Sequence, residues 1–191
     1  HRAKTGNISI LAAGKRTNFD RALPILSEIG YNILYCGKIG NASTLKVITN
    51  YLASLNLIAL GDCLMLSKKY GIDLTTAYHG IKISSGNSFV HETESQVILN
   101  GSYDVGFTMD LVYKDVGLIN ELLKKNNIPS DLSKLLFNIF KNGKRQLGER
   151  SLSTSITKIL ENYCQEVLRA PNFPSQLIDK NPRKKGFEIK F

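Results

Sequence analysis

Hydrophobic positions near the start of the chain come in short runs, whereas later ones recur at helical spacing. Residues 7–13 and 31–36 are apolar, β-branched runs that each end at a glycine, which is typical of buried strands. Between them, residues 19–29 place apolar side chains three residues apart, and this predicts a helix. Pro24 fits the helix only if its regular part begins close to the proline. The pattern indicates one crossover unit of an α/β sheet.

The two predicted strands need neighbours, because two strands alone do not make a stable sheet. Either sheet residues absent from this chain or a partner molecule supplies them, and we favour the first source. The chain also begins at His1 rather than at an initiating Met. We therefore expect it to be part of a longer polypeptide and to start inside a domain.

From Ser43 onward the pattern is helical throughout. The first helix runs to Lys69 and is apolar nearly all round, which predicts that protein surrounds it. Capping residues and stop signals divide the remainder into shorter helices. We expect these over residues 73–84, 89–99, 108–125, 131–146 and 153–167.

Charge and composition narrow the function classes. The formal net charge is +9, with basic clusters at 124–125, 141–145 and 183–185. Such clusters could follow the phosphates of a nucleic acid, but they lack interleaved aromatic residues and a recognition motif. We expect instead a solvated surface that attracts anionic ligands, and no nucleic-acid partner. Every run of about 18 mostly apolar residues contains a charged or polar residue, so we also expect no membrane span.

Neither the cysteines nor the histidines form a metal-binding pattern. The three cysteines have a spacing that fits neither a zinc site nor a redox pair, so we expect buried, reduced thiols in a cytoplasmic protein. His79 and His91 are twelve residues apart without a suitable carboxylate spacing. We interpret both histidines as structural and predict no metal site.

Lys46 and Asn50 lie four residues apart in the opening turns of the long apolar helix, and so on one face. The helix begins directly after the second strand, which favours a position in a crease between two domains, where ligand sites form. Burial there would lower the pKa of the lysine and let it exchange a proton near neutral pH. The alternative is that both side chains simply reach water.

Lys114 and Asp115 are a second candidate, since charges inside an apolar helix need partners. Asp115 could hold a helix end or an amide while Lys114 faces a cleft. The alternative is a solvated stripe in which Asp110 and Lys114 pair weakly at i and i+4. The sequence contains no G-x-G-x-x-G, no phosphate-binding P-loop and no G-x-S-x-G motif.

Four stretches carry motifs in a fixed order. They are AKTGNISILAAG, GKIGNASTLKVITNYL, GSYDVGFTMDLVYKDVGL and LRAPNFP. In this order the chain resembles the β-hydroxyacid dehydrogenases, the family of 3-hydroxyisobutyrate dehydrogenase, tartronate semialdehyde reductase and their 6-phosphogluconate dehydrogenase relatives. The second stretch is similar to the family's glycine turn and catalytic lysine, and the third is similar to its G-x-F…K-D signature.

The resemblance implies a mainly α fold. An all-helical domain, like the C-terminal domain of 6-phosphogluconate dehydrogenase, follows the last β-α-β piece of a Rossmann-type α/β domain. We expect residues 1–40 to be the terminal fragment of the dinucleotide-binding domain and residues 41–175 to be the helical substrate-binding and dimerisation domain. Residues 176–191 would be a basic tail. Family dimers pack around a helix such as 43–69, so the resemblance also implies a homodimer or homotetramer.

The resemblance further implies that Lys46 is the catalytic general acid/base and that Asn50 helps to fix the substrate. Phe107, Lys114 and Asp115 would belong to the cofactor-binding set, with Lys114 near the nicotinamide and Asp115 supporting it. The implied reaction is hydride transfer between NAD or NADP and a small, carboxylate-bearing 3-hydroxy acid or its carbonyl partner.

The chain departs from the family pattern in several places. Ala42 stands where the family usually has the second glycine of its turn, which is tolerable if φ stays negative. Thr49 replaces the first of two asparagines, so only Asn50 is carried over. The family's nucleotide-binding glycine loop and its Ser-Gly-Gly loop are absent. We therefore expect activity to belong to a longer parent protein, with NAD versus NADP left open. A non-catalytic interaction or dimerisation module derived from the family is the alternative.

Overall fold

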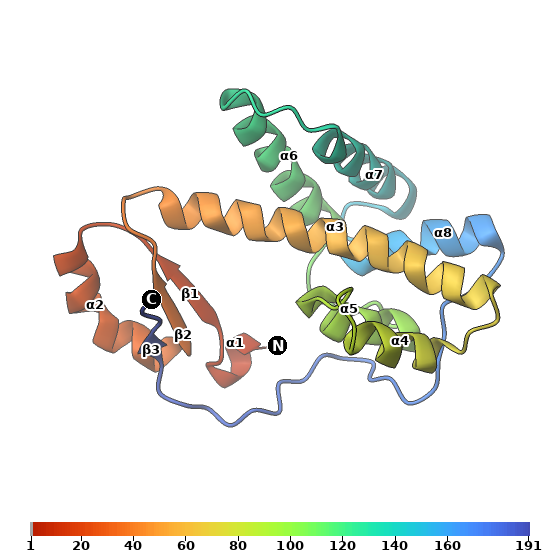
Figure 1. Cartoon of the computed structure of the whole chain (residues 1–191), viewed down its shortest axis with the longest axis horizontal. Helices are drawn as coiled ribbons and strands as arrows, with labels where there is room; N and C mark the ends of the chain where they lie inside the picture. Colours follow the sequence, from red (N-terminus) through yellow and green to blue (C-terminus); the bar gives the residue numbers. More distant parts are fainter. Residues whose placement is uncertain (1) are drawn as a thin grey trace. The chain divides into compact units, whose positions relative to one another are not determined.

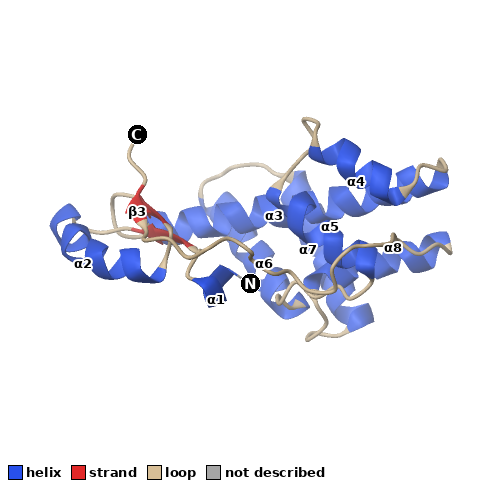
Figure 2. Ribbon diagram, turned by 90° about the horizontal axis from the view of Figure 1, so that it is seen from below, coloured by secondary structure: helices blue, strands red, loops and turns tan. Residues whose placement is uncertain are grey.

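The computed structural model describes residues 2–191, which form eight α-helices, one short 3-10 helix and three short strands (Figure 1). These residues divide into two compact units. The first unit joins the beginning of the chain, through Thr49, to its end, from Ile178 to Phe191. The second unit comprises residues 50–177. Figure 2 shows that strand structure is confined to one small sheet and that the rest of the regular structure is helical.

The first unit contains the predicted crossover. Strands β1 (Ser9–Ala12) and β2 (Asn32–Tyr35) are parallel, with Ser9 opposite Asn32 and Ala12 opposite Tyr35. The short helix α1 (Arg2–Thr5) precedes β1, and α2 (Arg16–Ile29) connects the two strands. Strand, helix and strand follow one another as the hydrophobic pattern predicts.

The expectation for Pro24 is wrong, because α2 begins at Arg16 and the proline lies in the helix interior. Tertiary contacts hold the turns before it. The Phe19 ring is buried and lies 5.0 Å from the Tyr35 ring. Arg16 pairs with Asp20 one turn further along the helix at 2.7 Å. These contacts offset the one backbone hydrogen bond that a proline removes.

The third strand comes from the other end of the chain. Strand β3 (Phe187–Glu188) lies parallel to β2, with Asn32 opposite Phe187, so the sheet order is β1-β2-β3 (Figure 1). The hydrophobic pattern predicts that additional strands come from residues outside this chain or from a partner. Within this chain the C-terminal segment, expected only as a basic tail, supplies one strand, and strands from outside the chain stay a prediction.

The second unit is helical, as predicted. Helix α3 begins in the first unit and continues through the second, and the later helices start and end within a few residues of the predicted positions. Their bounds are α3 Asn41–Lys69, α4 Leu74–Lys82, α5 Phe89–Asn100, α6 Met109–Lys125, α7 Asp131–Leu147, a 3-10 helix Ser153–Ile156, and α8 Thr157–Cys164. Asp73 caps α4 as expected, since its carboxylate accepts from the Thr76 backbone N–H at 2.8 Å.

Helix α3 is only partly surrounded by protein in this chain. Leu57, Leu60 and Leu64 are buried, but Leu52 and Leu66 are more than half exposed. By length and composition alone α3 could cross a membrane: its most apolar window has a mean hydropathy of 1.4 and is 28% buried. Core helices of globular proteins meet the same criterion. The polar breaks in the sequence therefore do not by themselves exclude a membrane span.

The expectation of buried thiols is also wrong. Cys63 is exposed on α3, and Cys36 and Cys164 are half-buried; all three are free thiols. Cys63 lies on the same side of α3 as the exposed leucines, because three- and four-residue steps return to one helix face. Its exposure follows from the open face of that helix.

Candidate functional site

The turn between β2 and α3 determines where α3 begins. Gly37 and Gly40 have φ angles of 80° and 96°, a region that glycine enters without the steric cost that other residues meet. The Asn41 side-chain amide donates to the Cys36 carbonyl at 2.7 Å and closes the turn. Ala42 lies in the first turn of α3 and is not among the residues with positive φ, so its methyl group is accommodated.

Lys46 follows in the second turn of α3, and its side chain is exposed. The apolar pattern of the helix predicted a buried Lys46, but within the described residues the side chain is not buried. Desolvation within this chain therefore gives no support to an acid/base role. That role rests on the resemblance and on the position of Lys46 directly after the glycine turn. Thr49, the second departure from the family pattern, turns back on the helix and donates to the Lys46 carbonyl at 2.9 Å.

Three of the predicted site residues lie together in the second unit. Asn50 on α3 donates through Nδ2 to Oδ2 of Asp115 on α6, at 2.5 Å. The other carboxylate oxygen of Asp115, Oδ1, lies 3.0 Å from Lys114 Nζ. The Asp115 side chain is 13% exposed and that of Lys114 is 61% exposed. A largely buried carboxylate thus links the predicted substrate residue to the predicted cofactor residue.

This arrangement fixes the orientation of the Asn50 amide. A carboxylate only accepts hydrogen bonds, so the NH₂ end of the amide faces Asp115 and its carbonyl end faces away. The backbone at Asn50 is also engaged, because Ser54 Oγ donates to its carbonyl at 2.9 Å. The sequence spacing placed Asn50 beside Lys46 on one helix, but it gave no sign of the contact with Asp115, which is 65 residues away.

The alternative pairing of Asp110 with Lys114 does not form. Asp110 instead pairs with Arg150 Nη1 at 3.2 Å and accepts from the Thr108 hydroxyl. The hydrogen bond from Thr108 and the charge of Arg150 hold the pKa of Asp110 below its usual range. Asp110 therefore interacts with Thr108 and Arg150, and the partner of Lys114 is Asp115.

Phe107 lies just before α6, whereas Lys114 and Asp115 lie within that helix. The Phe107 side chain is half-buried, and its carbonyl accepts from the Ser153 N–H at 2.8 Å. The structure shows Phe107 anchoring the segment before α6 and leaves its proposed cofactor role as a prediction.

His91 has structural surroundings, whereas His79 is exposed on α4. His91 is 1% exposed, and its Nε2 lies 2.9 Å from the Tyr78 carbonyl. Burial lowers the pKa of His91, which favours the neutral ring. Within residues 2–191, no three His, Cys, Asp or Glu side chains gather as a metal site would require.

The second unit contains a buried polar network that the sequence pattern does not predict. Glu161, 5% exposed, accepts from the Tyr103 hydroxyl at 2.5 Å, from the Leu168 N–H at 2.6 Å and from Arg169 at 3.0 Å. Burial and the hydrogen bond to Glu161 raise the pKa of Tyr103 to about 12. In the sequence the network shows only as one glutamate in α8 and an arginine shortly after that helix, and their spacing does not predict that they pair.

Comparison with known proteins gives these residues a family context. Residues 40–160 match the family model described as NAD-binding of NADP-dependent 3-hydroxyisobutyrate dehydrogenase. 2-(Hydroxymethyl)glutarate dehydrogenase from Eubacterium barkeri is 32% identical over 156 residues, which are 81% of this chain and 52% of that protein. L-Threonate dehydrogenase from Escherichia coli (strain K12) is 27% identical over 140 residues, 73% of this chain and 46% of that protein. The chain spans about half the length of these relatives.

The fold agrees with this context. The crystal structure of 3-hydroxyisobutyrate dehydrogenase from Salmonella typhimurium superposes with a TM-score of 0.75 at 26% identity, covering 83% of this chain and 56% of that one. The family match begins at Gly40, the last residue of the glycine turn, and includes the start of α3 and the Asn50–Asp115–Lys114 contacts. The chain belongs to the 3-hydroxyisobutyrate dehydrogenase family.

Proposed function

We propose that this chain is part of an NAD- or NADP-dependent oxidoreductase that moves hydride between the nicotinamide and a small 3-hydroxy acid or its carbonyl partner. The match of residues 40–160 to the family's NAD-binding segment carries the proposal. The relatives support the substrate class, because they are named as dehydrogenases of hydroxymethylglutarate, threonate and 3-hydroxyisobutyrate.

Lys46 is the proposed acid/base. During reduction its ammonium donates a proton to the carbonyl oxygen, and during oxidation its neutral amine removes the hydroxyl proton. An ammonium at that oxygen also stabilises the negative charge that develops there. Asn50, one helical turn further along α3, positions the substrate with an amide that Asp115 orients. Nicotinamide, when bound, accepts or supplies the hydride.

Lys114, Asp115 and Phe107 are the proposed cofactor residues. Lys114 offers an exposed ammonium whose position Asp115 restrains, which suits the oxygen-rich groups of a nicotinamide nucleotide. Asp115 then orients both a proposed substrate-binding residue and a proposed cofactor-binding residue, because one carboxylate oxygen contacts Asn50 and the other contacts Lys114. Phe107 is assigned through the resemblance alone.

An assay of the complete natural protein tests the function. We expect short 3-hydroxy acids to drive a change in nicotinamide absorbance with NAD or NADP. A complete protein that binds neither cofactor and oxidises none of these acids would favour the alternative, a non-catalytic interaction module derived from the family. A G-x-G-x-x-G motif upstream of His1 would argue for the enzyme before any assay.

The proposed partner for the open face of α3 is a second copy of the chain. Five exposed residues on this face are spaced three, four or seven residues apart, so they form one stripe along the helix. They are Ile48, Leu52, Ala59, Cys63 and Leu66. Burying such a stripe against its copy would remove apolar area from water at about 25 cal/mol per Å². The complete protein is accordingly proposed to be a homodimer or homotetramer.

Leu52→Glu is expected to shift the assembly towards monomer, because it places a carboxylate in the centre of the proposed apolar contact. Sedimentation equilibrium at micromolar concentration measures the shift. Leu132→Glu on α7 is the matched control, since Leu132 is exposed to 53% and Leu52 to 54%. A monomeric wild-type protein, or equal loss of assembly in both variants, would contradict the proposed contact.

A further inference from the structure

The positive charge of the protein lies almost entirely on one of its two units. The first unit, residues 1–49 with 178–191, contains twelve Lys and Arg residues against four Asp and Glu. The second unit, residues 50–177, contains thirteen against twelve. The formal charge is therefore +8 on the first unit and +1 on the second. The electrostatic field of this uneven charge raises the concentration of anions near the first unit.

Within the first unit, a basic segment docks on a basic body. The C-terminal segment 178–191 has five basic and two acidic residues, and residues 1–49 have seven and two. Specific contacts hold the two together despite their like charge. Arg16 pairs bidentately with Glu188 at 2.5 and 2.8 Å, and Asp179 accepts from Thr5 at 2.6 Å and from Asn7 at 2.7 Å.

The backbone of the segment is fitted closely to its site. The Gly186 N–H donates to the Ser27 carbonyl at 2.8 Å, and the Phe187 N–H donates to the Tyr31 carbonyl at 2.9 Å. A Cβ at position 186 would lie 2.0 Å from the Gly30 carbonyl oxygen, so only glycine fits there. The sequence of the segment thus defines its docked position, and non-specific association does not explain it.

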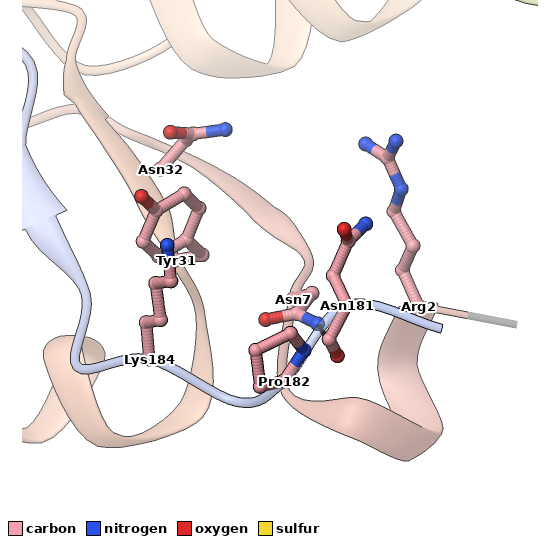
Figure 3. A pocket seen from close by; sticks show the side chains of 7 residues that line it. All are labelled: Arg2, Asn7, Tyr31, Asn32, Asn181, Pro182 and Lys184. Atoms are coloured by element: carbon pink, nitrogen blue, oxygen red, sulfur yellow. Dashed lines mark hydrogen bonds between the residues drawn. The ribbon is translucent and has the colours of Figure 1, made fainter. Parts of the chain in front are cut away.

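A cavity of about 290 Å³ lies between this segment and the start of the sheet (Figure 3). In Figure 3, Tyr31, Asn32 and Lys184 stand on one side, Arg2 and Asn181 on the other, and Asn7 and Pro182 between them. The lining thus contains two cations, three carboxamides and a phenol. Two of the carboxamides, Asn7 and Asn181, donate to the Asp179 carboxylate at 2.7 and 2.9 Å, so the cations of Arg2 and Lys184 are the groups that suit an oxyanion.

The cavity is at the opposite edge of the sheet from the proposed catalytic lysine. Asn7 precedes β1, and Tyr31 and Asn32 begin β2, so the cavity lies at the amino ends of these parallel strands. The turn that leads to Lys46 follows the carboxyl end of β2. A ligand in the cavity would therefore occupy a site of its own.

We propose that this cavity binds a small organic dianion, a phosphate monoester or a dicarboxylate, which bridges Arg2 and Lys184 and fastens the C-terminal segment to the sheet. The dianion offsets the repulsion between the two basic parts that meet there. Because Asn181, Pro182 and Lys184 come from the segment, the site exists only while the segment is docked. Binding and docking must then stabilise each other.

Titration of the complete protein with glycerol 3-phosphate and with succinate tests the proposal, at an ionic strength held constant with NaCl. Calorimetry measures affinity, and hydrogen exchange at the amides of Phe187 and Ile189 measures docking. We expect saturable binding and slower exchange at both amides. The tighter of the two ligands identifies the anionic group that the site prefers.

Arg2→Gln and Lys184→Gln should each weaken binding about tenfold, the usual effect of losing one charged hydrogen bond. Lys190→Gln, a lysine of the same segment outside the cavity, should leave the affinity unchanged. Lys46→Ala should also leave it unchanged, so the result is independent of the proposed catalytic function. Equal protection by NaCl alone, affinity unaffected in both cavity variants, or binding of duplex DNA only would each overturn the proposal.

Discussion

Lys46→Ala should lower the turnover number of the complete protein by about 10²–10⁴-fold, the usual contribution of a positioned acid or base. The variant removes the group that donates the proton to the carbonyl oxygen and also the charge that stabilises the alkoxide. Cofactor affinity should be retained, because Lys46 is not among the proposed cofactor residues. Steady-state assays at saturating cofactor, combined with cofactor titration by fluorescence, separate the two quantities.

Two further variants sharpen this test. Lys46→Arg keeps the positive charge but cannot give up a proton near neutral pH, so it should remain as slow as the alanine variant if proton transfer matters. Lys38→Ala removes an exposed lysine from the turn before α3 and should leave turnover near wild type. Near wild-type turnover in Lys46→Ala would remove Lys46 from the proposed chemistry.

Glu161→Ala should destabilise the second unit by about 3–5 kcal/mol, as expected when one partner of a buried ionic network is deleted. Glu161 is 5% exposed, and its loss would strand the Tyr103 hydroxyl, the Leu168 N–H and one guanidinium hydrogen bond of Arg169. Each of these groups would stay desolvated without a partner. Urea denaturation followed by circular dichroism measures the free energy of unfolding.

Glu166→Ala is the matched control for this prediction. Glu166 is also a glutamate near the end of α8, but its side chain is 36% exposed and pairs with Lys68 and Lys69 at 3.6 and 3.4 Å. Exposed pairs of this kind contribute about 0–1 kcal/mol. Comparable destabilisation in the two variants would show that burial of the network is not what stabilises it.

The local elements were predictable because they depend on short-range signals. Helix α3 was expected from Ser43 to Lys69 and is observed from Asn41 to Lys69, since apolar spacing and the closing lysines act over a few residues. The expected single helix from 153 to 167 is a 3-10 turn followed by an α-helix that ends at Cys164. Gln165 takes a left-handed conformation and stops it, which no residue type there announced.

The candidate site was predictable only in part. The resemblance selected Asn50, Lys114 and Asp115, and the structure brings these three into contact. The choice of Asp115 over Asp110 as the partner of Lys114 depended on Arg150 and Thr108, which occupy Asp110. The exposure of Lys46 was contrary to the expectation drawn from its apolar helix. Apolar residues nearby in sequence do not ensure burial, because burial depends on what packs against the helix.

The sequence by itself determined the order of the elements, the glycine turn before α3, the family and the identity of the residues proposed to act. These follow from local conformational preferences and from motifs a few residues long. Only the tertiary structure decided that residues 187–188 complete the sheet and that Glu161 joins Tyr103 to Arg169. It also decided that Arg2 and Lys184 share a cavity. These contacts join residues far apart in the chain, and their partners are selected by the packing of whole elements, which short-range patterns do not encode.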